Sequence, residues 1–336
     1  MNVYGSTTQV FLLDESSQIG GTRRGAQLAA EKAGFNEEDA GRVALLATEL
    51  ASNVLKHAER GSLHLRLVPG RASVGVELIS IDQGPGFDLA GCLADGYSTG
   101  GTQGIGLGAV SRMAQVFDAY TDQRGSVVMA RVYPGPSGRA DDIPLGVSQH
   151  SLGGDPACGD AWHVAFDDTR MCAVVIDGLG HGPDAERAAL AGTQAFAFDP
   201  FLSPDELMTS IHQSMTGTRG GAVAIAQFDA RRDELSFVGV GNISASLEAI
   251  ETSRGLPSHP GIVGAQFRKT HSLKYQRAAG VLLIMHSDGL QTRWRLSEYP
   301  GLWQRHPAVI AAVLCRDYSR GRDDVTVLVV ALEAKA

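Results

Sequence analysis

The sequence predicts an α+β protein of two domains. Its 336 residues are long for a single hydrophobic core. Strand-like segments outnumber helical ones, and the helices come in groups instead of alternating with strands, so a doubly wound parallel sheet is disfavoured. Pro134-Gly-Pro-Ser-Gly138 and the polar residues after it are typical of a linker. We therefore expect one domain at 1–134, a linker at 135–143 and a second domain at 144–336.

Alternating and helical spacing of apolar residues locates the elements of the first half. Asn36 is a candidate N-cap, and the acidic residues that follow favour the positive end of a helix. The expected elements are a strand at 8–13, a helix at 16–32, a helix after Asn36, strands at 63–68 and 74–81, a helix at 109–115 and a strand at 127–132.

The second half carries short apolar runs bounded by turn residues, together with three helical segments. We expect strands at 163–166, 172–176, 222–228, 235–240, 281–286 and 325–331, and helices at 184–196, 204–215 and 308–318. This strand-heavy order with grouped helices favours an α+β sandwich.

The composition excludes several classes of protein. Hydrophobic residues make up 43% of the chain and 41 residues are glycine, which suits a globular protein with many tight turns. The net charge is −8 without a basic stripe, so nucleic acid is not an expected partner. No apolar run reaches the ~18–20 residues that span a bilayer, and the four cysteines form no C-x-x-C pair. We expect a soluble, cytoplasmic protein with no membrane contact.

The first half contains residues suited to an ATP site. Glu49 and Asn53 lie four apart and share a helical face, with Lys56 close to it. An amide oxygen suits Mg²⁺, and a neighbouring carboxylate can deprotonate an attacking hydroxyl. Asp82, where a strand ends, could accept a hydrogen bond from the adenine amino group. Gly104, Gly106 and Gly108 open a helix whose backbone N–H groups could bind phosphate. Gly84 and Gly86, which follow Asp82, are further candidates for the cofactor site.

Each of these features has a structural alternative. A lone G-x-G-x-G before a helix is more often a close-packed turn, and Glu49 and Asn53 alone would be ordinary surface residues. The occurrence of all three motifs in this order favours the ATP site.

Residues 1–133 resemble the GHKL ATPase superfamily, and within it the RsbT-type serine kinases. The resemblance is carried by Glu49-Leu-Ala-Ser-Asn53 with His57-Ala58, and by Asp95-Gly-Tyr-Ser-Thr-Gly-Gly101 before Gly104-Ile-Gly-Leu-Gly108. It implies a Bergerat α/β sandwich in which Asn53 binds Mg²⁺, Glu49 is the base, Asp82 binds adenine and Lys56 reaches a phosphate. A histidine kinase is disfavoured because no histidine precedes His57.

The second half contains aspartates at strand edges. Asp160, Asp177, Asp288 and Asp323 would converge if two sheets faced each other, and carboxylate oxygens select Mg²⁺ or Mn²⁺. Two such ions can bind a phosphate and activate water. Gly178 fits a residue whose carbonyl is a ligand, because a side chain would crowd the metals. Alone, each aspartate is weak evidence, since Asp-Gly is a common turn.

Residues 145–332 resemble the PPM family of metal-dependent serine/threonine phosphatases, in its SpoIIE/RsbX branch. The most specific piece is Val175-Ile-Asp-Gly-Leu-Gly-His-Gly182. The resemblance implies an α-β-β-α sandwich. It also favours Asp160 over Asp155, and Asp323 over Asp324, as ligands.

Together the halves indicate a bifunctional regulator, an ATP-dependent protein serine kinase joined to a metal-dependent phosphoserine phosphatase. The two resemblances imply STAS-domain partners, either anti-sigma antagonists or stressosome scaffold proteins. Three alternatives stay open. The first half could be a nucleotide-gated, anti-sigma-like binding module, the phosphatase could serve a separate pathway, or one site could be degenerate.

Overall fold

The computed structural model describes residues 1–4, 8–93, 106–135, 141–266 and 270–333. The chain divides into two compact units. We call Ser6–Pro144 the N-terminal unit, and Met1–Gly5 together with Leu145–Ala336 the C-terminal unit. Each unit is described by itself.

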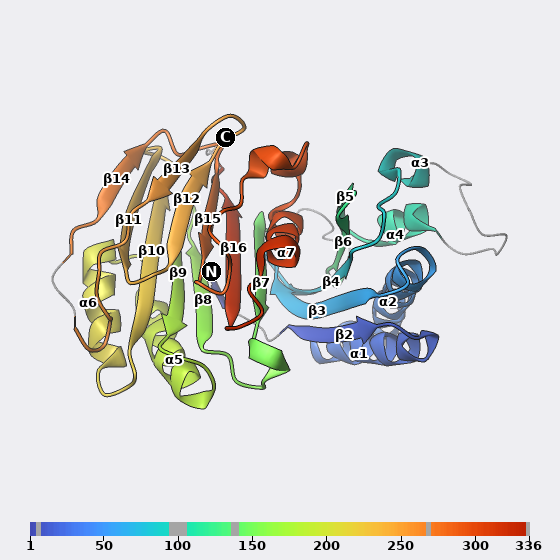
Figure 1. Ribbon diagram of the computed structural model, residues 1–336, viewed down its shortest axis with the longest axis horizontal. Helices are drawn as coiled ribbons and strands as arrows, with labels where there is room; N and C mark the ends of the chain where they lie inside the picture. Colours follow the sequence, from blue (N-terminus) through green and yellow to red (C-terminus); the bar gives the residue numbers. More distant parts are fainter. Residues whose placement is uncertain (5–7, 94–105, 136–140, 267–269, 334–336) are drawn as a thin grey trace. The chain divides into compact units, whose positions relative to one another are not determined.

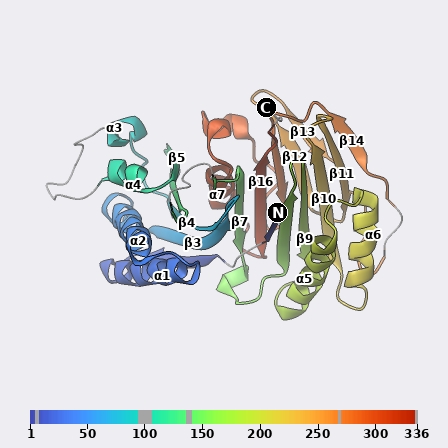
Figure 2. The same ribbon diagram turned by 180° about the vertical axis from the view of Figure 1, so that it is seen from behind.

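The N-terminal unit is an antiparallel sheet with two long helices on one face. The strands run in the order β2-β3-β4-β6-β5. Figure 1 and Figure 2 show α1 and α2 side by side along this sheet. Its elements are β2 (Gln9–Leu13), α1 (Ile19–Lys32), α2 (Glu37–His57), β3 (Gly61–Pro69), β4 (Val74–Asp82), α3 (Leu89–Leu93), α4 (Leu107–Met113), β5 (Val116–Asp122) and β6 (Gly125–Val132).

Helix α2 is the central element of this unit, and its sequence explains its position. The Asn36 side chain accepts a hydrogen bond from the backbone N–H of Asp39, which confirms the predicted N-cap. Val43, Leu46 and Leu50 recur at helical spacing and are fully buried in the core between helices and sheet. The opposite face of α2 is therefore left for polar residues.

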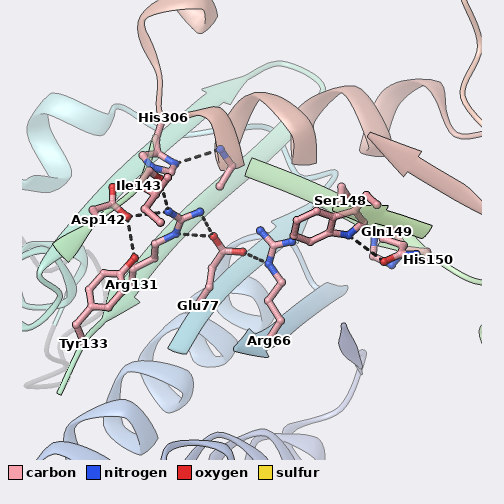
Figure 3. A network of polar contacts seen from close by, with 12 residues as sticks. Arg66, Glu77, Arg131, Tyr133, Asp142, Ile143, Ser148, Gln149, His150 and His306 are labelled. Carbon is pink, nitrogen blue, oxygen red and sulfur yellow. Dashed lines mark hydrogen bonds and ion pairs between the residues drawn. The ribbon is translucent and has the colours of Figure 1, made fainter. Parts of the chain in front are cut away.

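The sheet face turned away from α1 and α2 carries a buried ion network (Figure 3). Glu77 on β4 accepts from Nε of Arg66 at 2.5 Å and from Nε of Arg131 at 2.7 Å. Arg131 also donates to Asp142, which accepts from the hydroxyl of Tyr133 at 2.9 Å. Burial would raise the pKa of Glu77, but the two guanidinium groups outweigh it and lower that pKa to about 2.

The C-terminal unit contains two antiparallel sheets with helices on their outer faces. One sheet has the order β1-β8-β9-β10-β11-β14 and the other β13-β12-β15-β16-β7. Helices α5 and α6 pack on the first sheet and α7 on the second (Figure 1). The strands are β1 (Asn2–Tyr4), β7 (Leu145–His150), β8 (Asp160–Phe166), β9 (Arg170–Gly178), β10 (Gly221–Asp229), β11 (Glu234–Val240), β12 (Ser244–Glu248), β13 (Ser253–Leu256), β14 (Leu273–Gln276), β15 (Leu282–His286) and β16 (Val325–Ala331), and the helices are α5 (Pro183–Phe198), α6 (Pro204–Met215) and α7 (Pro307–Tyr318).

The α+β class predicted from the sequence is confirmed, but the pairing of the first strand was not anticipated. Strand β1 pairs with β8, so that Asn2 lies opposite Ala165 and Val3 opposite Val164. The first residues, expected in the N-terminal domain, therefore belong to the C-terminal unit. Three residues carry too little periodicity to reveal such a distant partner. No helix among the described residues is long and apolar enough to cross a membrane.

Candidate functional site

The polar face of α2 carries the three residues predicted from its sequence. Glu49 and Asn53 are half-buried, whereas Lys56 in the last turn is exposed. Burial raises the pKa of the Glu49 carboxyl, and the nearby charge of Lys56 partly offsets this. A raised pKa makes the carboxylate a better proton acceptor near neutral pH. The helix thus presents a candidate base, a candidate amide ligand and a cation along one side.

Asp82 ends β4 and is fixed by the loops around it. Its Oδ1 accepts from the backbone N–H of Gly84 at 2.9 Å and from that of Ser126 at 3.2 Å. A Cβ on Gly84 would lie 2.8 Å from the Cβ of Ala58, just after α2. A side chain at position 84 would therefore clash with Ala58, which explains why this position is glycine. The loop after Asp82 thus lies against the end of α2.

The remaining predicted glycines occupy different environments. Gly86 has a φ of +76°, and a Cβ there would lie 2.5 Å from the carbonyl oxygen of Asp122, so both conformation and space require glycine. Gly106 is the N-cap of α4, and Gly108 lies within that helix. Gly104 and the predicted stretch at 95–101 lie outside the described residues. Phosphate binding by these glycines stays a prediction.

In the C-terminal unit, strand register brings the first two predicted aspartates together. Asp160 begins β8 and lies opposite Asp177 in the pairing of β8 with β9. Asp288 follows β15 and Asp323 precedes β16 in the second sheet. Both sheets therefore contribute carboxylates to the same end of the unit.

A cavity of about 330 Å³ receives three of these aspartates. Asp177, Asp288 and Asp323 line it. Its remaining lining residues are Leu179, Gly180, Gly221, Ala222, Gly241, Asn242, Pro260, Gly261 and Ile262. Asp160 is not among the lining residues; it is 3% exposed and accepts from the hydroxyl of Ser287 at 2.6 Å.

Burial, together with the charge of neighbouring carboxylates, raises the pKa values of Asp160, Asp177 and Asp323. Burial is the largest cause at Asp177, followed by the charges of Asp160, Asp288 and Asp323. Burial also raises the pKa of Asp160. At Asp323 burial and the charge of Asp288 raise the pKa, while His181 acts in the opposite direction. Such repulsion is relieved when cations bind.

The two adjacent aspartates before β16 differ in their surroundings. Asp324 is 3% exposed and accepts from the backbone N–H groups of Leu152 and Gly159, each at 2.6 Å. Asp323 is half-buried and lines the aspartate cavity. Asp324 therefore ties backbone segments together, whereas Asp323 faces the space in which a ligand would bind.

Gly178 is buried at the end of β9 for a packing reason. A Cβ there would lie 2.3 Å from the carbonyl oxygen of Ala185 in α5, so this helix approaches the strand too closely for a side chain. Its N–H donates to the carbonyl of Gly159 at 2.9 Å. Its role as a carbonyl ligand stays a prediction.

The donor chemistry of the cavity fits Mg²⁺ or Mn²⁺, because it offers carboxylate oxygens and no thiolate or imidazole in its lining. In the part of the chain that the structure describes, no group of three or more His, Cys, Asp or Glu side chains is already gathered closely enough to hold a metal ion. The carboxylates share a cavity but do not form a closed cage.

Two polar residues of this region were given no role by the sequence analysis. Ser287 donates to Asp160, and its oxygen accepts from the backbone N–H of Thr326 at 2.9 Å, so it joins the two sheets. Asn242 donates to Oδ2 of Asp288 at 2.7 Å. Ser287 stands directly before Asp288 in the sequence, but no local pattern marks Asn242, which is 46 residues away.

Comparison with known proteins finds relatives for both halves of the chain. Residues 13–132 match the histidine kinase-like ATPase domain family. The serine/threonine-protein kinase RsbT of Bacillus subtilis (strain 168) is 36% identical over 89 residues, which are 26% of this chain and 67% of RsbT. The phosphoserine phosphatase RsbX of the same organism is 27% identical over 147 residues, 43% of this chain and 73% of RsbX.

A solved structure described as "The bacterial stressosome: a modular system that has been adapted to control secondary messenger signaling" is also similar. The two sequences are 28% identical and the TM-score is 0.50; the match covers 55% of the present chain and 97% of the solved chain. The chain belongs, through its N-terminal histidine kinase-like ATPase domain, to the RsbT family of serine/threonine-protein kinases, and its C-terminal unit has the PP2C-type fold of the SpoIIE and RsbX phosphatases.

Proposed function

We propose that this chain is a bifunctional signalling regulator that phosphorylates and dephosphorylates serine residues of STAS-domain proteins. The observation that carries the proposal is the occurrence of an RsbT-like and an RsbX-like sequence in one chain. The similarity to a stressosome-related structure supports partners of the anti-sigma antagonist or stressosome type.

In the kinase half, bound ATP would supply the phosphoryl group, and Mg²⁺ would neutralise part of its charge. Asn53 would hold the metal through its amide oxygen, and Asp82, whose Oδ1 accepts from Gly84 and Ser126, would accept a hydrogen bond from adenine. Glu49 would take the proton of the substrate hydroxyl, and its raised pKa suits that role. Lys56 and the glycines at 84, 86, 104, 106 and 108 would contact the phosphates.

In the phosphatase half, a pair of Mg²⁺ or Mn²⁺ ions would supply an activated water and bind the phosphate. Asp160, Asp177, Asp288, Asp323 and the carbonyl of Gly178 are the residues that would hold them. Asn242 orients Asp288, and Ser287 fixes the buried Asp160. These neighbours limit rotation of the carboxylates and so help to position them.

The proposal is tested with the purified full chain, [γ-³²P]ATP, Mg²⁺ or Mn²⁺, and the STAS-domain proteins encoded nearest to its gene. We expect label on a serine of one STAS protein to persist with Asp177→Asn but not with the wild type, because the wild type removes what it adds. Glu49→Gln in the Asp177→Asn background should abolish labelling. Glu38→Gln, an exposed change in the first turn of the same helix, and Asp168→Asn, in the turn between β8 and β9, are matched controls.

The outcomes separate the two halves. If ATP binds but no variant yields label, the N-terminal unit is a nucleotide-gated binding module and not a kinase. If label persists equally with the wild type and Asp177→Asn, the C-terminal unit does not act on the product of the N-terminal unit. A wild-type protein that fails to dephosphorylate any phosphoserine substrate contradicts the phosphatase assignment.

A further inference from the structure

A second cavity adjoins the aspartate cavity of the C-terminal unit. It has a volume of about 520 Å³ and shares Asp288 and Asp323 with the aspartate cavity. Its other lining residues are Gln291, Thr292, Arg293, Ser319, Arg320 and Arg322. We call it the arginine cavity. The segment after β15 contributes Asp288 and Arg293, and the segment between α7 and β16 contributes Arg320, Arg322 and Asp323, so the lining combines two carboxylates with three guanidinium groups.

The walls of the arginine cavity are fixed by backbone contacts. One wall follows β15 and the other lies between α7 and β16. The N–H of Gln291 donates to the carbonyl of Tyr318 at 2.9 Å, and the N–H of Arg320 donates to the carbonyl of Gly289 at 2.8 Å. An isolated bridge also pairs Leu290 with Ser319. These contacts join the backbones of the two segments that carry the arginines and the aspartates.

The three arginines of this cavity are exposed. Among the described residues, no side-chain hydrogen bond or ion pair joins Arg293, Arg320 or Arg322 to another residue. Arg316 differs from them, since its side chain is 2% exposed and its Nε lies 2.6 Å from Oδ1 of Asp317. Cations without internal partners beside a catalytic cavity are suited to bind an anionic ligand.

We propose that the arginine cavity binds carboxylate side chains of the protein substrate that flank its phosphorylated residue. This inference rests on the proposed phosphatase function, in which the phosphoryl group enters the aspartate cavity. Because the two cavities share a wall and an extended chain advances ~3.3 Å per residue, the flanking side chains would lie within a few residues of the phosphoserine. The planar fork of arginine matches a carboxylate with two parallel hydrogen bonds.

The same arrangement gives selectivity. A substrate with basic residues beside the phosphoserine would meet three like charges, which disfavours binding. A substrate with neutral flanks would leave the guanidinium groups in water at no gain. Acidic flanks would therefore be preferred, and salt would weaken that preference because the arginines are exposed.

The test compares two phosphoserine peptides that differ only in flanking Glu or Gln residues. Hydrolysis of p-nitrophenyl phosphate by the full-length wild type with Mn²⁺ first tests the phosphatase function itself. We expect kcat/KM to favour the Glu peptide roughly 3- to 10-fold, and Arg293→Gln/Arg320→Gln to bring this ratio close to one. The control Arg231→Gln/Arg232→Gln removes the same charge from the turn between β10 and β11, at the other end of β10 from the cavity, and should keep the ratio.

A binding measurement makes the inference independent of turnover. Fluorescence anisotropy of the two labelled peptides with Asp177→Asn should show the same preference in Kd, lost with the double arginine variant and diminished by salt. An unchanged ratio, or an equal loss for both peptides, would overturn the inference. If the wild type hydrolyses no small phosphate ester, the proposed function fails, while the anisotropy ratio still decides whether the arginines select acidic peptides.

Discussion

The two candidate sites are built on different kinds of backbone. In the C-terminal unit the aspartates stand at strand ends of two sheets, and the strand register sets Asp160 opposite Asp177. In the N-terminal unit the residues come from one helix, one strand end and a glycine-rich segment. The C-terminal site brings like charges together, whereas the N-terminal site has its candidate base, amide and cation along one side of α2.

This difference indicates where each site is sensitive to substitution. Strand-end carboxylates are tied to neighbours on both sheets, so a change there affects charge balance, hydrogen bonding and, at the most buried positions, the fold. Residues on the polar side of α2 lie outside the packed core, and their replacement should affect chemistry with little effect on folding. The predictions below separate these contributions.

The largest expected effect is on catalysis in the C-terminal unit. Asp288→Asn should lower phosphatase kcat/KM by at least about 100-fold, because a proposed metal ligand is lost. Asn242→Ala should lower it by about 10-fold, because only the orientation of Asp288 is affected. Steady-state kinetics over a range of Mn²⁺ concentrations measures both, with Asp168→Asn as the control. Equal effects of the two substitutions would contradict the distinction between ligand and positioning residue.

A smaller effect, on the free energy of unfolding, should distinguish Asp324 from Asp323. Asp324→Ala should lower the free energy of unfolding by about 3 kcal/mol, because two buried backbone N–H groups lose a charged acceptor. Asp323→Ala should change it by less than about 1 kcal/mol while abolishing phosphatase activity. All three tryptophans (Trp162, Trp294 and Trp303) lie in the C-terminal unit, so denaturant unfolding followed by their fluorescence reports on it. The reverse pattern would make Asp324 the ligand.

The smallest effect concerns the pH dependence of the N-terminal unit. The pKa of Glu77 is lowered to about 2 from 4.5, so its stabilising contribution is complete above pH 4.5 and is lost as pH falls toward 2. Across that window the stability of the wild type should fall more steeply with decreasing pH than that of Glu77→Gln, because protonation of Glu77 removes its attraction to the two guanidinium groups. Hydrogen exchange of β4 and β6 peptides, compared at matched pH, measures this. Parallel curves for the two proteins would show that Glu77 has an ordinary pKa.

Local patterns predicted much of the architecture. Helix α2 and its Asn36 cap follow from spacing and capping chemistry within one segment, as do β4 and β16. Strands β5, β7 and β12 were not predicted, because their length and pattern are ordinary. Strand β7 also pairs with the distant β16, whereas β5 and β12 each pair with the strand that follows. The Arg66–Glu77–Arg131 network was missed because charged residues in a strand usually indicate a solvent face.

The same limit applies to the candidate sites. Asp177 and Asp288 could be selected because each stands in a motif next to glycine, and the structure places both on one cavity. The support from Asn242 and the arginine cavity could not be predicted. The Asn242 contact and the arginine cavity both depend on loops that come into contact only after the two sheets have formed. No spacing of residues in the sequence predicts that contact.

The pairing of β1 with β8 has a consequence for chain topology. Because residues 2–4 complete the sheet of the C-terminal unit, the N-terminal unit is in effect an insertion between two strands of its neighbour, β1 and β7. During synthesis β1 leaves the ribosome about 160 residues before β8, so the inserted unit can fold before β1 pairs with its partner. Cutting the chain between residues 134 and 144 would also leave the edge of β8 unpaired, and an unpaired edge promotes self-association. A separately expressed phosphatase half would therefore need its first five residues restored, for example by circular permutation.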